Sequence, residues 1–177
     1  MIEGPELISL IDTNTKEGKT DSVLSFLSKK EFHTLINYPM EAERQTPADD
    51  WFSYDVQAFG VIIESVNDEI CSVSFRMNMS DLLSEKGPVF KGEIDGRIEK
   101  NSCRKDVRDC YGSPDMTNTY FDQYLLNKTL VLGLIYDTDK KDQLIIASIG
   151  SRRIFSNNIL QPNRWSLIFD SMNMNPR

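Results

Sequence analysis

The strongest constraint on the fold is a resemblance between the two halves of the chain. A helical pattern precedes WFSYDVQAFGVIIESVNDEICSVSF in the first half, and a shorter one precedes YFDQYLLNKTLVLGLIYDTDKKDQLIIASI in the second. In this alignment, residues 51–52 match 120–121, residues 60–66 match 131–137, and residues 70–75 match 144–149. A helix followed by three strands cannot bury its sheet face alone, so we expect both units to form one sheet.

Alternating β-branched and aromatic residues predict three strands in each half. The predicted strands are 51–57, 59–66, 70–77, 119–126, 129–136 and 143–149. Phe52, Tyr54 and Val56 share one face of the first strand, and Trp51, Ser53, Asp55 and Gln57 share the other. We expect the first of these faces in the core and the second to meet solvent.

Apolar spacing also predicts helices. One begins near Asp21 and ends at Pro39, and Ser102 is expected to cap a second one with Val107 and Cys110 facing inward. Gly112 would end that second helix in a left-handed conformation. A short C-terminal amphipathic helix is predicted from Trp165, Ile168, Phe169 and Met172, and residues 78–100 form an extended connector with room for a short edge strand.

These patterns predict an α+β fold in which helices pack on one face of an antiparallel sheet. The 177 residues suit one domain, with pseudo-repeats at about 20–77 and 102–150 and an extension over 151–177.

The charge is acidic and unevenly distributed. Residues 1–100 carry 19 acidic and 10 basic side chains, whereas residues 101–177 carry 8 and 10. Nucleic-acid binding requires a basic patch that displaces counterions from phosphates, and this chain has none. A basic protein partner fits the charge better, and a moderate negative charge also serves solubility alone.

The N-terminus lacks the pattern of a secretory signal, and the longest apolar run is about six residues, far below the ~20 needed to span a bilayer. We therefore expect a cytoplasmic protein without a membrane partner. Its three cysteines do not form a disulfide framework, and Cys71 is expected to be buried. Cys103 and Cys110 are interpreted as structural.

No catalytic or cofactor motif is present: HExxH, CxxC, GxSxG, GxGxxG and GxxxxGK[ST] are all missing. The single histidine, His33, has no second imidazole with which to hold a metal. These absences favour a binding protein over an enzyme, with no cofactor and no metal.

Acidic residues around one tryptophan are the candidate binding surface. The candidates are Glu41, Glu43, Asp49, Asp50, Trp51, Asp55, Asp68 and Glu69. Acidic side chains beside an exposed aromatic suit a cationic protein, because charge speeds the encounter and the aromatic anchors the complex. The alternative is a solvated, charged loop without a partner.

The segments WFSYDVQAFGVIIESVNDEICSVSF and FKGEIDGRIEKNSCRKDVRDCYGSPD resemble a group of small bacterial proteins that includes immunity proteins of bacteriocins and polymorphic toxins. The resemblance covers about residues 20–150. Its markers are Gly60, Gly92-Glu93-Ile94, Val107 and Gly112-Ser113-Pro114-Asp115, and it departs where Asp95 replaces a proline. The tandem architecture is also similar to β-lactamase-inhibitor protein and to small outer-membrane assembly lipoproteins.

The resemblance implies a cytoplasmic immunity protein, monomeric or homodimeric, that blocks the active site or substrate approach of a basic toxin such as a nuclease. The alternative is an adaptor or chaperone-like module that holds a secretion or envelope component, and an enzyme of unrecognised type is a third possibility.

Overall fold

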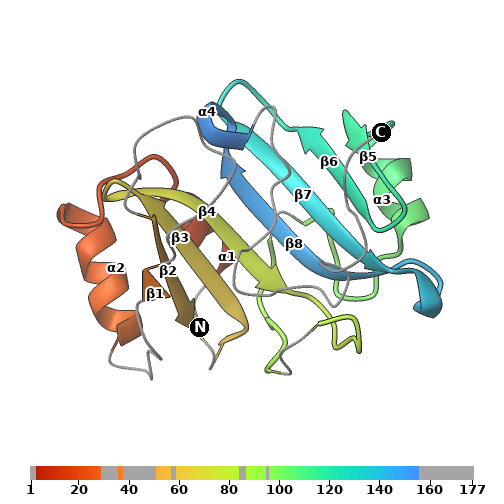
Figure 1. Ribbon diagram of the computed structural model, residues 1–177, viewed down its shortest axis with the longest axis horizontal. Coiled ribbons are helices and arrows are strands. Elements are labelled where there is room, and N and C mark those ends of the chain that lie inside the picture. Colours follow the sequence, from red (N-terminus) through yellow and green to blue (C-terminus); the bar gives the residue numbers. More distant parts are fainter. Residues whose placement is uncertain are drawn as a thin grey trace.

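In the computed structural model, eight strands of the described residues form one antiparallel sheet at the centre of the fold (Figure 1). The structure describes residues 3–28, 36–37, 51–56, 59–83, 87–94 and 96–155. The strands are β1 (Ile36–Asn37), β2 (Trp51–Val56), β3 (Val61–Val66), β4 (Glu69–Arg76), β5 (Met116–Thr117), β6 (Phe121–Leu125), β7 (Leu130–Asp137) and β8 (Gln143–Ser151), in the order β1-β2-β3-β4-β8-β7-β6-β5. This arrangement confirms the predicted antiparallel sheet and α+β class. The six longer strands begin and end within two residues of their predicted bounds.

The two halves of the sheet meet where β4 pairs with β8. Ser74 lies opposite Ser148, and their side-chain oxygens are 2.7 Å apart. Counting outward from this pair, Ser74 faces Ile62 on β3 while Ser148 faces Gly133 on β7. Each half has a register shift at a corresponding place, at residues 64/65 in β3 and at 135/136 in β7. The two meanders therefore extend in opposite directions from a central strand pair.

The first predicted helix is shorter than expected. α2 (Gly18–Ser28) contains its beginning, but Ile36–Asn37 near its predicted end form β1 instead. These two residues pair with Ser53 and Phe52 of β2, so strand pairing with a distant segment replaces the local helical tendency there. A further short helix that was not predicted, α1 (Gly4–Ile8), precedes α2.

The helix before the second meander, α3 (Arg104–Tyr111), begins one residue later than predicted, because Cys103 rather than Ser102 is its N-cap. Val107 is buried as expected, but Cys110 is exposed, so its inward placement was wrong. The residue four positions after Val107 faces inward instead, since the Tyr111 ring packs 5.4 Å from the Tyr124 ring. Gly112 follows with a φ of +81° and a ψ of −155°, so its φ is positive as expected but it does not take the left-handed helical conformation that was predicted.

The main core lies on one face of the sheet. It joins Leu7 of α1, Leu24 of α2 and Val107 of α3 to residues of β2, β3, β4, β7 and β8. Tyr54 and Val56 belong to this cluster, in agreement with the predicted core face of the first long strand. Within the connector, Phe90 and Ile94 are buried in the same cluster, and no strand is assigned to its described residues.

The opposite face of the sheet also carries buried side chains on β3 and β4. The side chains of Trp51, Ser53, Asp55 and Gln57, which were expected to meet solvent, lie outside what the structure describes. Ile62, Glu64 and Ser72 are each fully buried, and the Ser72 hydroxyl donates a 2.7 Å hydrogen bond to Glu64. Ile62 packs with Ile135 and Ile146 of the second meander, so both faces of the sheet carry buried side chains.

Two further short elements lie within and directly after the second meander. They are the 3-10 helix η2 (Thr138–Lys140), between β7 and β8, and α4 (Arg152–Phe155), directly after β8. The predicted C-terminal helix lies outside the described residues. None of the helices in the described ranges is long and apolar enough to cross a membrane.

Candidate functional site

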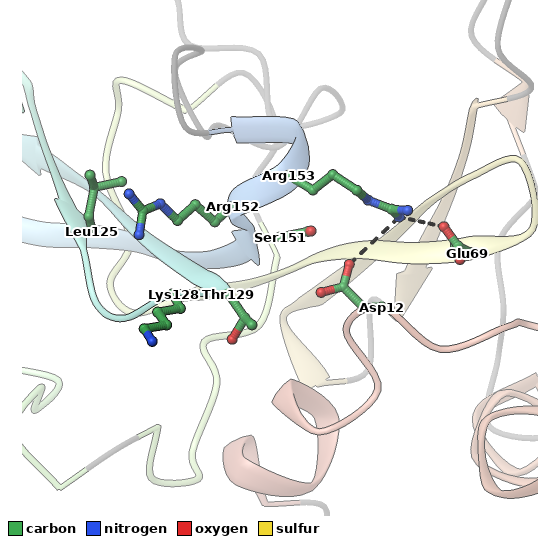
Figure 2. Close-up of a pocket in the computed structure, with 8 residues that line it drawn as sticks. All are labelled: Asp12, Glu69, Leu125, Lys128, Thr129, Ser151, Arg152 and Arg153. Atoms are coloured by element: carbon green, nitrogen blue, oxygen red, sulfur yellow. Dashed lines mark hydrogen bonds and ion pairs between the residues drawn. The ribbon is translucent and has the colours of Figure 1, made fainter.

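A cavity of about 720 Å³ lies at the end of the sheet where β8 passes into α4 (Figure 2). Its lining comes from the loop after α1, the start of β4, the hairpin between β6 and β7, and the start of α4. The lining residues are Asp12, Glu69, Leu125, Lys128, Thr129, Ser151, Arg152 and Arg153. Segments from both meanders therefore contribute to one cavity.

One wall of the cavity is acidic. Glu69 starts β4 directly after the tight turn at Asn67 and Asp68, both of which have a positive φ. The loop after α1 lies against this strand, because the Asp12 amide donates a 2.8 Å hydrogen bond to the Ile70 carbonyl. These backbone contacts hold the Asp12 and Glu69 carboxylates on the same side of the cavity (Figure 2).

Arg153 joins the two carboxylates of this wall. Its guanidinium forms an ion pair with Glu69 and lies 3.8 Å from the Asp12 carboxylate. The hydrogen bond with Glu69 raises the pKa of Arg153, so this side chain stays charged. All three side chains are partly exposed, and such ion pairs contribute only about 0–1 kcal/mol.

The opposite wall is basic. Asn127 shapes the hairpin between β6 and β7, because its side-chain oxygen accepts hydrogen bonds from the Thr129 and Leu130 amides at 2.7 and 2.9 Å. Arg152 is tied to this hairpin by its amide, 2.7 Å from the Thr129 carbonyl, and by its guanidinium, 3.1 Å from the Asn127 carbonyl. Figure 2 shows Arg152 and Arg153 extending in opposite directions from α4, with Lys128 on the Arg152 side.

Ser151 lines the cavity between these walls. It is fully buried, and its hydroxyl has no hydrogen-bond partner in the described part of the chain. An unpartnered buried hydroxyl costs about 1–3 kcal/mol. Among the hydroxyls in this state in the described part of the chain, which include those of Ser65, Tyr124 and Tyr136, that of Ser151 belongs to a residue lining the cavity.

A second polar cluster joins α3 to β6. Asp122 on β6 is fully buried and pairs with Arg104 and Arg108 of α3, each at 2.8 Å. Thr117 of β5 donates a further hydrogen bond of 2.6 Å to the same carboxylate. Burial alone would raise the pKa of Asp122, but the hydrogen bonds from Arg108, Arg104 and Thr117 outweigh it and lower the pKa to about 2.

Two tyrosines line the same cluster. The Arg104 guanidinium lies 5.0 Å from the centre of the Tyr136 ring, and burial together with the Asp122 charge raises the pKa of that tyrosine. Burial also raises the pKa of Tyr124. These groups keep α3 fixed to the second meander, a structural role.

The predicted acidic surface is described at four of its eight positions. Glu41, Glu43, Asp49 and Asp50 lie outside the described residues. Asp68 lies in the turn between β3 and β4 and pairs with Lys16 at 2.6 Å, while Glu69 pairs with Arg153. Both carboxylates are partly exposed but already hold a cation of this chain.

The strand register places Trp51 at the same end of the sheet. Trp51 starts β2 opposite Val66, and Val66 is also opposite Glu69 on the next strand. Asp55 lies four residues further along β2, opposite Ile62, and so is not at this end. The described backbone therefore brings together Trp51, Asp68 and Glu69.

Sequence reasoning missed Asp12 and the basic residues of the cavity. Arg153 is 84 residues from its partner Glu69, and no local pattern connects them. The only local signal is the turn-forming residue Asn127, which predicts a hairpin but does not indicate what that hairpin faces. The basic wall depends on how the two meanders meet.

The described residues hold no group of three or more His, Cys, Asp or Glu side chains suited to a metal ion. His33 lies outside them. Cys71 is buried as predicted, Cys103 caps α3, and no disulfide joins any of the three cysteines, all of which lie in the described ranges. The lining of the cavity therefore consists of charged side chains, hydroxyl groups and one leucine.

Comparisons of the chain with protein-family models, with curated proteins and with solved structures give no match.

Proposed function

We propose that this chain is a cytoplasmic immunity protein that binds a cationic toxin and blocks its active site or substrate approach, and that it is not an enzyme. The observation that carries the proposal is the register at one end of the sheet. There Trp51 starts β2 beside the strand end that leads into Asp68 and Glu69. An aromatic residue beside carboxylates suits a basic protein surface.

The loop after α1 adds acidic residues to this end of the sheet. Thr15 donates its amide to the Asp68 carbonyl at 2.7 Å, and Asn14 forms a β-bridge with Glu69. Asp12 and Glu17 of this loop are exposed. They supply two carboxylates next to the turn, which supports a surface larger than the sequence indicated.

The ion pairs already present here are compatible with binding a basic partner. Lys16 and Asp68 are both partly exposed, and Glu69 and Arg153 are too. Exposed pairs contribute little stability, so a lysine or arginine of the partner replaces Lys16 or Arg153 at low cost. The displaced cations return to solvent.

We also propose that the chain contains two copies of one unit, a helix followed by a meander, with the helices on one face of the sheet. The mirrored strand order and the register shifts at 64/65 and 135/136 support this interpretation. From the Ser74–Ser148 pair outward, Asp55 and Gln123 occupy corresponding positions, since they face Ile62 and Gly133. This alignment moves the proposed match of Trp51 by one residue, from Tyr120 to Thr119.

Copurification tests the proposed partner. The tagged full-length chain is used as bait in its native host, and proteins recovered in stoichiometric amount are identified. We expect a basic toxin domain whose activity is lost in the complex. Recovery of a secretion or envelope component would instead favour an adaptor, and recovery of no stoichiometric protein would contradict both binding functions.

A further inference from the structure

The basic wall of the cavity has the groups needed to hold a phosphate. Lys128 makes no ion pair with any described residue, and only one nitrogen of the Arg152 guanidinium is used, in its bond with Asn127. Both side chains line the cavity. An arginine and a lysine match the charge and the several acceptor oxygens of a phosphate.

Ser151 is the second, independent indication of a ligand. Its hydroxyl is fully buried and lacks a hydrogen-bond partner among the residues described, yet the residue lines the cavity. In Figure 2 its side chain lies between those of Arg152 and Arg153. A ligand oxygen that accepts a hydrogen bond from this hydroxyl would satisfy it.

The size of the cavity and its acidic wall indicate what the ligand contains besides a phosphate. A volume of about 720 Å³ lies within the ~300–1,000 Å³ typical of small-molecule sites and far exceeds one phosphate. The Asp12 and Glu69 carboxylates accept hydrogen bonds from hydroxyl or amino groups. The ligand class is therefore an organic molecule with a phosphate at one end and such donors at the other.

We propose that this cavity binds a phosphorylated small molecule of mononucleotide size, with the phosphate held by Lys128, Arg152 and Ser151. The phosphate-binding residues are not part of the proposed toxin surface, although Asp12 and Glu69 belong to both sites, and the proposal does not depend on the toxin-binding role.

Calorimetric titration of the full-length chain tests the site with three probes: adenosine monophosphate, inorganic phosphate and adenosine, all at one ionic strength. We expect saturable binding of the monophosphate, competition by inorganic phosphate and much weaker binding of adenosine. No saturable binding of the monophosphate at millimolar concentration would overturn the proposal, and so would equal binding of adenosine.

Three variants locate the binding. Lys128→Ala is expected to raise the Kd about tenfold, because a charged hydrogen bond to phosphate is lost. Lys105→Ala, which removes an exposed lysine of α3, is the matched control and is expected to leave the Kd unchanged. An equal effect of both substitutions would mean that the monophosphate responds to net charge alone, against a site.

Ser151→Ala separates a binding role from a structural one. The unpartnered hydroxyl contributes nothing to the ligand-free fold, so we expect an unchanged or higher thermal midpoint together with a several-fold higher Kd. An unchanged Kd would remove Ser151 from the site and overturn its assignment.

Discussion

The two meanders share one topology but hold their helices in different ways. In the second meander, α3 is bound to β6 by the buried carboxylate of Asp122 and two arginines. Asp55 and Gln123 occupy corresponding positions in the two meanders, so the counterpart of Asp122 is Tyr54. Tyr54 packs in the apolar core with Leu24 of α2. The same architecture thus uses charge on one side and apolar contact on the other.

The acidic residues of the two meanders also differ in burial. Asp122 is fully buried and holds three hydrogen-bonding partners, so it serves the fold. Asp68 and Glu69 are partly exposed with one exchangeable cation each. We therefore expect Asp122 to matter for stability, and Asp68 and Glu69 to matter for binding.

The largest effect is expected from Asp122→Ala. The change leaves Arg104, whose side chain is mostly buried, without its anion, and such a loss costs about 3–5 kcal/mol. Urea unfolding measures the free energy, with Asp109→Ala, an exposed acid of α3, as control. A cost below about 1 kcal/mol for Asp122→Ala would show that charge does not hold α3 in place.

Glycine substitutions compare turns in the two halves. Gly60, at the turn between β2 and β3, has a φ of +65°, and a Cβ there would overlap the Pro88 carbonyl oxygen. Gly112 has a φ of +81°, but no atom lies within 4 Å of its Cβ position.

We therefore expect Gly112→Ala to cost about 2 kcal/mol from backbone strain alone, and Gly60→Ala about 3 kcal/mol or more. Thermal unfolding of both variants measures the difference. Equal costs would mean that a Cβ at position 60 fits beside the Pro88 carbonyl, contrary to the packing described above.

Acid should weaken the attachment of α3 to β6 in the second meander. The pKa of Asp122 is about 2 in the folded chain against 3.8 for the free side chain. A carboxyl with a lowered pKa stabilises the fold at pH above about 4, and this stabilisation is lost as the pH falls toward 2. We expect a loss of about 2 kcal/mol over this interval.

Unfolding free energies measured from pH 5 to pH 2 test this expectation, with Asp122→Asn as control. The substituted chain should lose less stability over the interval than the native chain. Parallel curves would assign the acid sensitivity to other carboxylates.

The smallest stability effect concerns the junction of the meanders. Ser74 and Ser148 share one buried hydrogen bond there. Each single alanine substitution leaves a hydroxyl unpaired, whereas the double substitution removes both, so a double-mutant cycle should give a coupling of about 1 kcal/mol. Additive single effects would argue against direct pairing across the junction.

The six longer strands were predictable from the sequence because each is a run rich in β-branched, aromatic or other apolar residues, and turn residues separate the runs, as at Asn67-Asp68. The two-residue strands β1 and β5 were not, since two residues carry no period. The inward face of α3 was misread at Cys110 because the helix packs Val107 with Tyr111, at a spacing of four.

The candidate site was less predictable than the fold. Asp68 and Glu69 are adjacent in the sequence, so they were found together, but their partners Lys16 and Arg153 come from distant segments. A carboxylate and its counterion separated by 52 or 84 residues leave no local pattern. The proposed surface was therefore identified by its acids alone, without the cations that occupy it.

Matched turns at opposite ends of the sheet give the most direct test of partner binding. The β3–β4 turn carries Asp68 and Glu69, and the β7–β8 turn carries Asp139 and Asp142. Two double variants remove the same amount of charge: Asp68→Asn with Glu69→Gln in the first turn, and Asp139→Asn with Asp142→Asn in the second. Asparagine tolerates the positive φ that Asp68 and Asp142 adopt.

The decisive measurement is copurification of the stoichiometric partner by these two variants and by the native chain. We predict that a cationic toxin is retained by the native chain and by the β7–β8 variant but is reduced or lost with the β3–β4 variant. Equal recovery by both variants would contradict the assignment of the binding surface to the end of the sheet formed by Trp51, Asp68 and Glu69.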